Sequence, residues 1–130
     1  MTDLLFAYGT LITYHAPHEI NDLVSKLRPV REGNVRGELF DFGDFPAVRL
    51  DPAGQEISGM VYEIADLETL RRLDIYEEFD PKHPESSLFR RERTPVNTGA
   101  GPLDCWIYVY NRDLRSAPRI LSGRYAPERK

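Results

Sequence analysis

This chain of 130 residues has one cysteine, no excess of basic residues and no long hydrophobic run. Cys105 is its single cysteine, which excludes an intramolecular disulfide and a multi-cysteine metal site and fits a reducing compartment. Lysine and arginine number 17 against 21 acidic residues, so the chain lacks the basic balance expected of a nucleic-acid surface. The longest apolar runs, such as Cys105–Tyr110, fall far short of the roughly 20 residues that cross a membrane.

The first residues also lack the basic segment of an export signal, because Asp3 leads directly into a strand-like run. We therefore expect a cytoplasmic protein with neither a nucleic-acid nor a membrane partner. A chain of this length holds one hydrophobic core. We expect a single domain over residues 1–125 and a frayed tail over residues 126–130. The sequence does not indicate an oligomeric state.

Two segments have the periodicity of amphipathic helices. Apolar residues at i, i+3, i+4 and i+7 predict a helix over residues 17–27 that ends before Pro29. A second helix is predicted over Asp66–Phe79, with Asp66 as its N-cap, and a polar loop follows over Asp80–Ser87. Strands are predicted at Leu4–Tyr8, Val35–Phe42, Ala47–Leu50, Ile57–Ile64, Phe89–Val96 and Cys105–Tyr110.

The predicted strands outnumber the helices, and the linkers between successive strands are mostly short. We expect Ala47–Leu50 to pair with Ile57–Ile64, and Phe89–Val96 to pair with Cys105–Tyr110 as a second hairpin. Short linkers favour antiparallel pairing, because parallel strands need a long crossover. The pattern thus indicates an α+β fold and disfavours a doubly wound α/β sheet.

Two carboxylates of the second helix lie on its apolar face. At about 100° per residue, Glu77 falls between Leu70 and Leu73. Asp74 falls between Leu67 and Leu70 on the same wheel. A carboxylate on an apolar face is costly to ionise, which raises its pKa toward the range useful for moving protons. Glu77 is therefore a candidate general acid or base.

Two structural explanations compete with catalysis for these carboxylates. Either acid could form an ion pair with Arg90, Arg91 or Arg93, because buried acidic residues almost always have a partner. Alternatively, the helix ends near Asp74 and Glu77 merely begins a loop.

A second candidate site is the sequence Tyr8-Gly9-Thr10-Leu11 at the end of the first strand. Gly9 permits a close approach of the backbone to a ligand, and consecutive turn amides can bind an anion. On these four residues alone, an ordinary strand-to-loop turn is the favoured explanation. His15 and His18 have no third imidazole or second cysteine nearby, so we expect no metal site and no cofactor.

Taken together, the motifs resemble the γ-glutamylcyclotransferase-like family, in particular the branch of γ-glutamylamine cyclotransferase and the plant avirulence-induced proteins. The matching segments are, in order, Phe6–Leu11, Val35–Leu39, Gly43–Ala47, Ser58–Glu63, Leu73–Glu77, Phe89–Arg91 and Trp106–Tyr110. The resemblance implies a small, mainly antiparallel mixed β-barrel with two or so helices packed outside.

The resemblance also implies roles for the candidate residues. Tyr8, Gly9, Thr10 and Leu11 would bind substrate, and Glu77 would transfer the proton. Two positions depart from the family pattern. Glu78 replaces the usual glycine after the glutamate, where a carboxylate bears on access or on the pKa of its neighbour. Gly123-Arg124-Tyr125 replaces a Gly-Asp-Trp near the C-terminus.

The implied activity is cyclisation of a γ-glutamyl amine or peptide to 5-oxoproline with release of a free amine. The partner is then a small γ-glutamyl molecule. The alternative is a catalytically silent module that binds a small molecule in the same fold.

Overall fold

The structure is a computed structural model that describes residues 3–8, 25–41, 46–112 and 117–124. Most of the described chain is strand, with one α-helix and one short 3-10 helix. The elements are β1 (Asp3–Ala7), β2 (Leu27–Asp41), β3 (Pro46–Leu50), β4 (Gln55–Ile64), α2 (Leu67–Tyr76), η3 (Pro84–Ser86), β5 (Phe89–Thr98) and β6 (Gly101–Tyr110).

Five of the strands close into a barrel. The sheet order is β3-β2-β4-β1-β6-β5, and an additional pairing of β2 with β5 joins the two sides. This closure uses the pairs Gly33–Thr98 and Asn34–Asn97, while β3 extends the sheet beyond β2. β1 runs parallel to β6 and every other pairing is antiparallel. The expected mixed, mainly antiparallel barrel is therefore confirmed.

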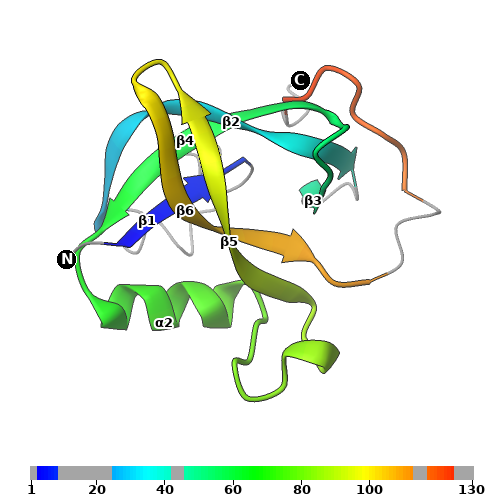
Figure 1. Cartoon of the computed structure of the whole chain (residues 1–130). Helices are drawn as coiled ribbons and strands as arrows, with labels where there is room; N and C mark the ends of the chain where they lie inside the picture. The colour runs from blue at the N-terminus through cyan, green and yellow to red at the C-terminus, as the bar shows by residue number, and fades with distance from the viewer. Residues whose placement is uncertain (1–2, 9–24, 42–45, 113–116, 125–130) are drawn as a thin grey trace, which may run out of the picture.

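Helix α2 packs outside the barrel and lies below the strands in Figure 1. Its Leu70 and Leu73 are buried against residues of the strands' outer faces, among them Leu5, Tyr62 and Tyr108. A second buried cluster takes alternate residues from all five barrel strands and fills the interior. Its members include Phe6, Val35, Val61, Val96 and Ile107. Among the described residues, α2 is the one α-helix, where two or so were expected.

The start of β2 corrects the first predicted helix. Residues 17–24 of that helix lie outside the described residues, but Leu27 belongs to β2, which is much longer than the predicted strand Val35–Phe42. Pro29 does not follow a helix, because it lies in β2 where the pairing with β4 shifts register. A bulge tolerates a residue that has no N–H to donate.

The two predicted hairpins have opposite outcomes. β5 and β6 pair from Phe89–Tyr110 to Thr98–Gly101, as expected. The expected pairing of Ala47–Leu50 with Ile57–Ile64 is wrong, because β2 lies between β3 and β4. Gly37 of β2 faces Leu50 on one edge and Gln55 on the other. The short linker between β3 and β4 therefore crosses over β2.

Helix α2 begins where the sequence predicts and ends earlier. The Asp66 carboxylate accepts the backbone N–H of Thr69 at 2.8 Å, which confirms it as the N-cap. The helix ends at Tyr76, not Phe79, with Glu77 as the C-cap. The next two residues close a Schellman motif: Glu78 N–H donates to the Ile75 carbonyl and Phe79 N–H to the Asp74 carbonyl.

The Schellman motif explains why the family pattern has a glycine at the position that Glu78 occupies in this chain. Glu78 has φ +56°, the left-handed conformation that the motif requires and that glycine adopts without steric cost. Its side chain is exposed. The family glycine is thus replaced at a position where a glycine relieves backbone strain.

Glu78→Gly should stabilise the protein by about 1 kcal/mol, because a left-handed L-residue is strained by a comparable amount. Chemical denaturation would measure the change in the free energy of unfolding. Glu78→Ala is the matched control, since it removes the carboxylate and keeps the Cβ atom. An equal gain in Glu78→Ala would assign the effect to charge and contradict backbone strain as its cause.

Candidate active site

Asp74 is buried between α2 and the barrel, where two strands supply its partners. Its carboxylate accepts two hydrogen bonds from the Arg91 guanidinium, Nε to Oδ1 at 2.8 Å and NH2 to Oδ2 at 3.2 Å. The Tyr108 hydroxyl donates a third to Oδ1 at 2.6 Å. The side chains of Arg91 and Asp74 are only 14% and 7% exposed, so water screens this ion pair little. Asp74 is therefore fully engaged with β5 and β6.

The network continues from Tyr108 to the end of β1. The hydroxyl of Tyr8, the residue directly after β1, donates a hydrogen bond to the backbone carbonyl of Tyr108. Tyr8 is buried, and burial, together with the nearby charge of Glu77, raises its pKa well above the ordinary value. A backbone hydrogen bond from Val48 opposes that rise. The Tyr8 side chain thus stays a neutral donor at physiological pH.

Glu77 lies one turn along α2 from Asp74, and its environment differs. Its side chain is partly buried, and loss of hydration, reinforced by the negative charge of Asp74, raises its pKa to about 8. Within the described ranges, no hydrogen bond or ion pair engages the Glu77 carboxyl. At pH 7 this carboxyl is mostly protonated and available to exchange a proton.

These positions answer the structural question that the sequence left open for Asp74. Asp74 forms the structural ion pair, and its partner among the three candidate arginines is Arg91. The helix does end before Glu77, as one alternative held, yet Glu77 stays on the side of Asp74 and Tyr8 because the C-cap keeps near-helical backbone angles. Leu67, expected on the buried face, is 61% exposed.

Only part of the predicted substrate-binding segment can be placed. Tyr8 approaches Glu77 closely enough for the carboxylate charge to act on its pKa. Gly9, Thr10 and Leu11 lie outside the described residues. The sequence analysis gave no role to the Tyr108 side chain, since a tyrosine in the aromatic run Trp106–Tyr110 is typical of a core strand. Its hydroxyl becomes informative only once β6 lies beside α2.

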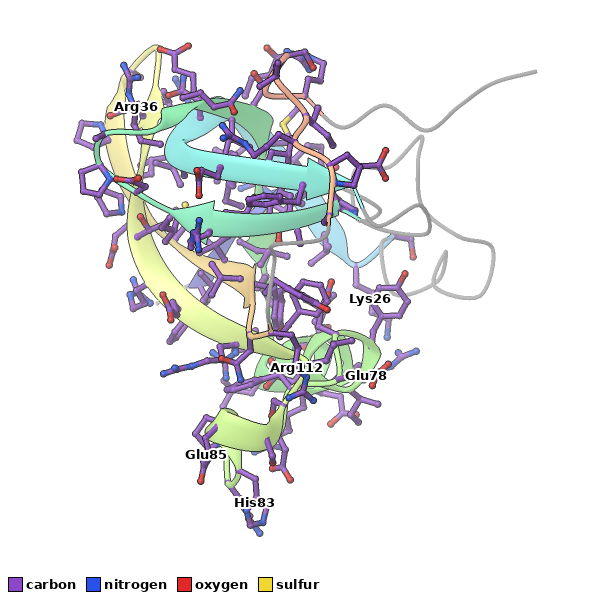
Figure 2. All side chains as sticks on the ribbon, turned by 90° about the vertical axis from the view of Figure 1, so that its right-hand side faces the viewer. Lys26, Arg36, Glu78, His83, Glu85 and Arg112 are labelled. Carbon is purple, nitrogen blue, oxygen red and sulfur yellow. The ribbon has the colours of Figure 1, made fainter. Side chains whose placement is uncertain are left out.

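The loop after α2 is held in place by residues that follow β6. The side-chain amide of Asn111 donates to the carbonyls of Pro84 and Ser87 at 3.0 and 2.9 Å, and Arg112 donates to Ser86 at 3.0 Å. Figure 2 shows His83 and Glu85 at the outer end of this loop, below the barrel. The loop borders a pocket of about 380 Å³, whose wall near α2 includes Ile75, Glu78 and Phe79.

Two further observations concern other chemistries. Across the described ranges, no group of three His, Cys, Asp or Glu side chains could hold a metal ion. Cys105 is buried, and burial raises the pKa of its thiol to about 11, as expected for a structural cysteine. In the same part of the chain, no helix has both the length and the apolar character needed to span a bilayer.

Comparison with known proteins identifies the family of this chain. A family model described as gamma-glutamyl cyclotransferase, AIG2-like, matches residues 5–127. The chain belongs to this family. It is also 36% identical over 110 residues to the gamma-L-glutamyl-butirosin B gamma-glutamyl cyclotransferase of Niallia circulans, a match that covers 84% of this chain and 67% of the relative. The expected cyclotransferase-type enzyme is confirmed at the level of the family.

Solved structures of the same fold agree with this placement. An AIG2-like protein from Mus musculus superposes with a TM-score of 0.70, at 19% identity, over 99% of this chain and 98% of the mouse chain. YkqA from Bacillus subtilis superposes with a TM-score of 0.73 at 26% identity over 96% of this chain. The chain spans only 40% of the length of YkqA.

The Asp74–Arg91 pair predicts unequal effects for two arginine substitutions on β5. Arg91→Met should destabilise the protein by about 3 kcal/mol, because it leaves the buried Asp74 carboxylate without its cation. Arg93→Met is a matched control: Arg93 also lies over the Trp106 ring, but its partner Asp104 is 60% exposed. That substitution should cost less than about 1 kcal/mol. Urea denaturation of both variants would contradict burial as the cause if the two losses were equal.

Proposed function

We propose that this protein cyclises a γ-glutamyl amine to 5-oxoproline and a free amine, with Glu77 as the general acid and base. The observation that supports this most is the environment of Glu77. Its carboxyl has a pKa of about 8, lies close enough to Tyr8 for its charge to raise the pKa of that hydroxyl, and engages no hydrogen-bond or ion-pair partner among the described residues. A general acid or base is most effective when its pKa lies near the working pH.

The proton balance of the reaction suits one carboxyl group. The α-amine of the substrate is largely protonated at neutral pH, so it must lose a proton before its lone pair can attack the γ-carbonyl. The ionised form of Glu77 takes this proton. The neutral amine attacks and closes the five-membered ring with two hydrogens still on the ring nitrogen, and the bond to the leaving nitrogen breaks as Glu77 gives its proton to that nitrogen. The regenerated carboxylate then takes the second hydrogen from the ring nitrogen and passes it to the released amine, which leaves as an ammonium ion. No other proton donor is needed for the cycle.

Positioning supplies the rest of the rate enhancement. Both reacting groups belong to one molecule, so the site need only hold the γ-glutamyl chain in a curled conformation. The resemblance assigns this task to Tyr8, Gly9, Thr10 and Leu11, whose backbone amides would bind the substrate carboxylate or the developing oxyanion. Of these four residues the structure describes Tyr8, whose buried side chain is anchored by a hydrogen bond to the Tyr108 carbonyl. This fixed position supports a role for Tyr8 beside the substrate.

The loop over Asp80–Ser87 is our candidate for recognition of the leaving amine. It follows Glu77 closely, and the lining of the pocket that it borders includes Ile75 and Glu78, on either side of Glu77 in the sequence. The named substrate of the Niallia relative, gamma-L-glutamyl-butirosin B, adds a large amine to the compounds worth testing. A panel of this compound, γ-glutamyl-ε-lysine, γ-glutamyl peptides and simple γ-glutamyl amines, assayed for 5-oxoproline, would rank the leaving groups. Saturable binding of the panel without product would instead indicate a binding module.

Glu77→Gln should lower kcat by about 10²- to 10⁴-fold and change KM little, because an amide cannot carry the proton. Release of 5-oxoproline from the best compound of the panel is the measurement. Glu68→Gln is the matched control and should retain activity, since Glu68 is exposed in the first turn of the same helix. Turnover of Glu77→Gln at the wild-type rate would exclude Glu77 as the acid and base.

The melting temperature of Glu77→Gln shows whether this variant is folded. The pKa of Glu77 rises from an ordinary 4.5 to about 8 on folding, so its contribution to stability is complete below pH 4.5 and is lost as the pH rises through 8. Glu77→Gln lacks this loss. Its melting temperature should therefore equal or exceed that of the wild type at pH 9.

The pH dependence of kcat/KM should have an acid limb with a midpoint near pH 8, the pKa of Glu77. Below it, the rate should fall about tenfold per pH unit as the carboxyl becomes protonated and unable to accept the ammonium proton. Initial rates between pH 5.5 and 9 test this expectation. An acid limb with a midpoint near 4.5 would show that the carboxyl is not desolvated in the working enzyme.

A further inference from the structure

We propose that Asp74 is a positioning residue: held by Arg91 and Tyr108, it fixes the end of α2, and with it Glu77, against Tyr8, the residue directly after β1. This inference rests on the proposed role of Glu77. It adds three residues that contact one another in the described structure and places them one step away from the proton transfer.

Asp74 and Glu77 are three residues apart at the end of α2. Residues three apart are neighbours on one helix face, so the Asp74 and Glu77 side chains share the side that turns toward the barrel. Glu77 lies beyond the last helical residue, Tyr76, where few helical hydrogen bonds hold the backbone. An anchor one turn earlier limits the movement of the helix end.

Tyr108 connects the helix to Tyr8, directly after β1, through two different atoms. Its hydroxyl donates to Asp74 at 2.6 Å, and its backbone carbonyl accepts the hydroxyl of Tyr8. Tyr8, Tyr108 and Asp74 are all buried, at 6%, 3% and 5% exposure. Because tightly packed buried groups have little freedom to move, this chain of contacts holds the Asp74 turn of α2 at a defined distance from Tyr8.

The charges around Glu77 point the same way. In the part of the chain that the structure describes, the groups that face this region are Asp74 on α2, Tyr8 after β1, Arg91 on β5 and Tyr108 on β6. Arg91 binds Asp74, and both tyrosine hydroxyls donate within the network, so none of these groups neutralises Glu77. The charge of Asp74 then acts on Glu77 and favours its protonated form.

Stability alone does not account for the buried Asp74–Arg91 pair. A buried ion pair contributes little net stability, since desolvation of both charges offsets their attraction, and apolar residues of similar size often serve as well. Arg91 also lies 4.3 Å from the centre of the Trp106 ring, which keeps its guanidinium plane in place. The value of such a fixed pair is a defined geometry, as expected beside a catalytic group.

The test uses two substitutions in the network and one outside it. Asp74→Asn removes the charge and keeps most of the shape. Tyr108→Phe keeps the charge and removes one hydrogen bond. Asp104→Asn is the matched control, because Asp104 also pairs with an arginine of β5, Arg93, but on the exposed surface. The readouts are kcat, KM and the acid limb of kcat/KM, with Glu77→Gln assayed alongside.

We expect three distinct results. Asp74→Asn should lower kcat about 10- to 100-fold and move the acid limb down by about one pH unit, because a fixed negative charge is gone. Tyr108→Phe should lower kcat about tenfold, with KM little changed and the acid limb near its original pH. Asp104→Asn should change none of these. A purely structural role would lower the melting temperature and leave kcat and the acid limb of the folded enzyme unchanged.

The outcomes separate this inference from the proposed function. If Glu77→Gln is inactive while Asp74→Asn and Tyr108→Phe keep the wild-type kcat and acid limb, Glu77 keeps its role and the positioning inference is wrong. If Glu77→Gln turns over normally, the proposed function itself fails. Should Asp74→Asn not fold, Tyr108→Phe decides alone: wild-type kcat in that variant overturns the inference.

Discussion

A buried carboxylate on the barrel side of α2 constrains the structure around the candidate site. Removing the charge of Asp74 from water is costly unless donors replace its hydration, and those donors must come from the surface against which the helix packs. Arg91 and Tyr108 meet that need from adjacent strands, β5 and β6. The position of the helix along the barrel therefore follows from hydrogen-bond geometry as well as from the less directional packing of Leu70 and Leu73.

The place of β1 in the barrel makes this arrangement possible. β1 pairs with β4 on one side and with β6 on the other, so Tyr8 emerges beside Tyr108. Gly59 of β4 permits the close packing of β1, because a Cβ atom there would lie 2.3 Å from the Ala7 carbonyl oxygen. The glycine of the Ser58–Glu63 motif thus has a steric cause: it lies against Ala7, the residue directly before Tyr8.

Sequence reasoning succeeded where the determinants are local. The N-cap at Asp66, the hairpin of β5 and β6, and the inward side of Asp74 and Glu77 all depend on residues close together in the chain. It failed where pairing is non-local. Residues 28–32 of β2 are all exposed, so the strand has no apolar alternation to reveal it, and the insertion of β2 between β3 and β4 follows from the whole sheet. Arg91 could not be chosen among three arginines until β5 lay beside α2.

Asp74 and Glu77, three positions apart, thus have opposite environments. Asp74 receives three hydrogen bonds and holds its charge in a fixed place, whereas Glu77, with no such partner among the described residues, is driven toward its protonated form by lost hydration and by Asp74 itself. A second arginine beside Glu77 would favour its ionised form and weaken it as a base. In the proposed mechanism the network therefore acts through the placement of its cation: Arg91 pairs with Asp74, and no cation in the described part of the chain pairs with Glu77.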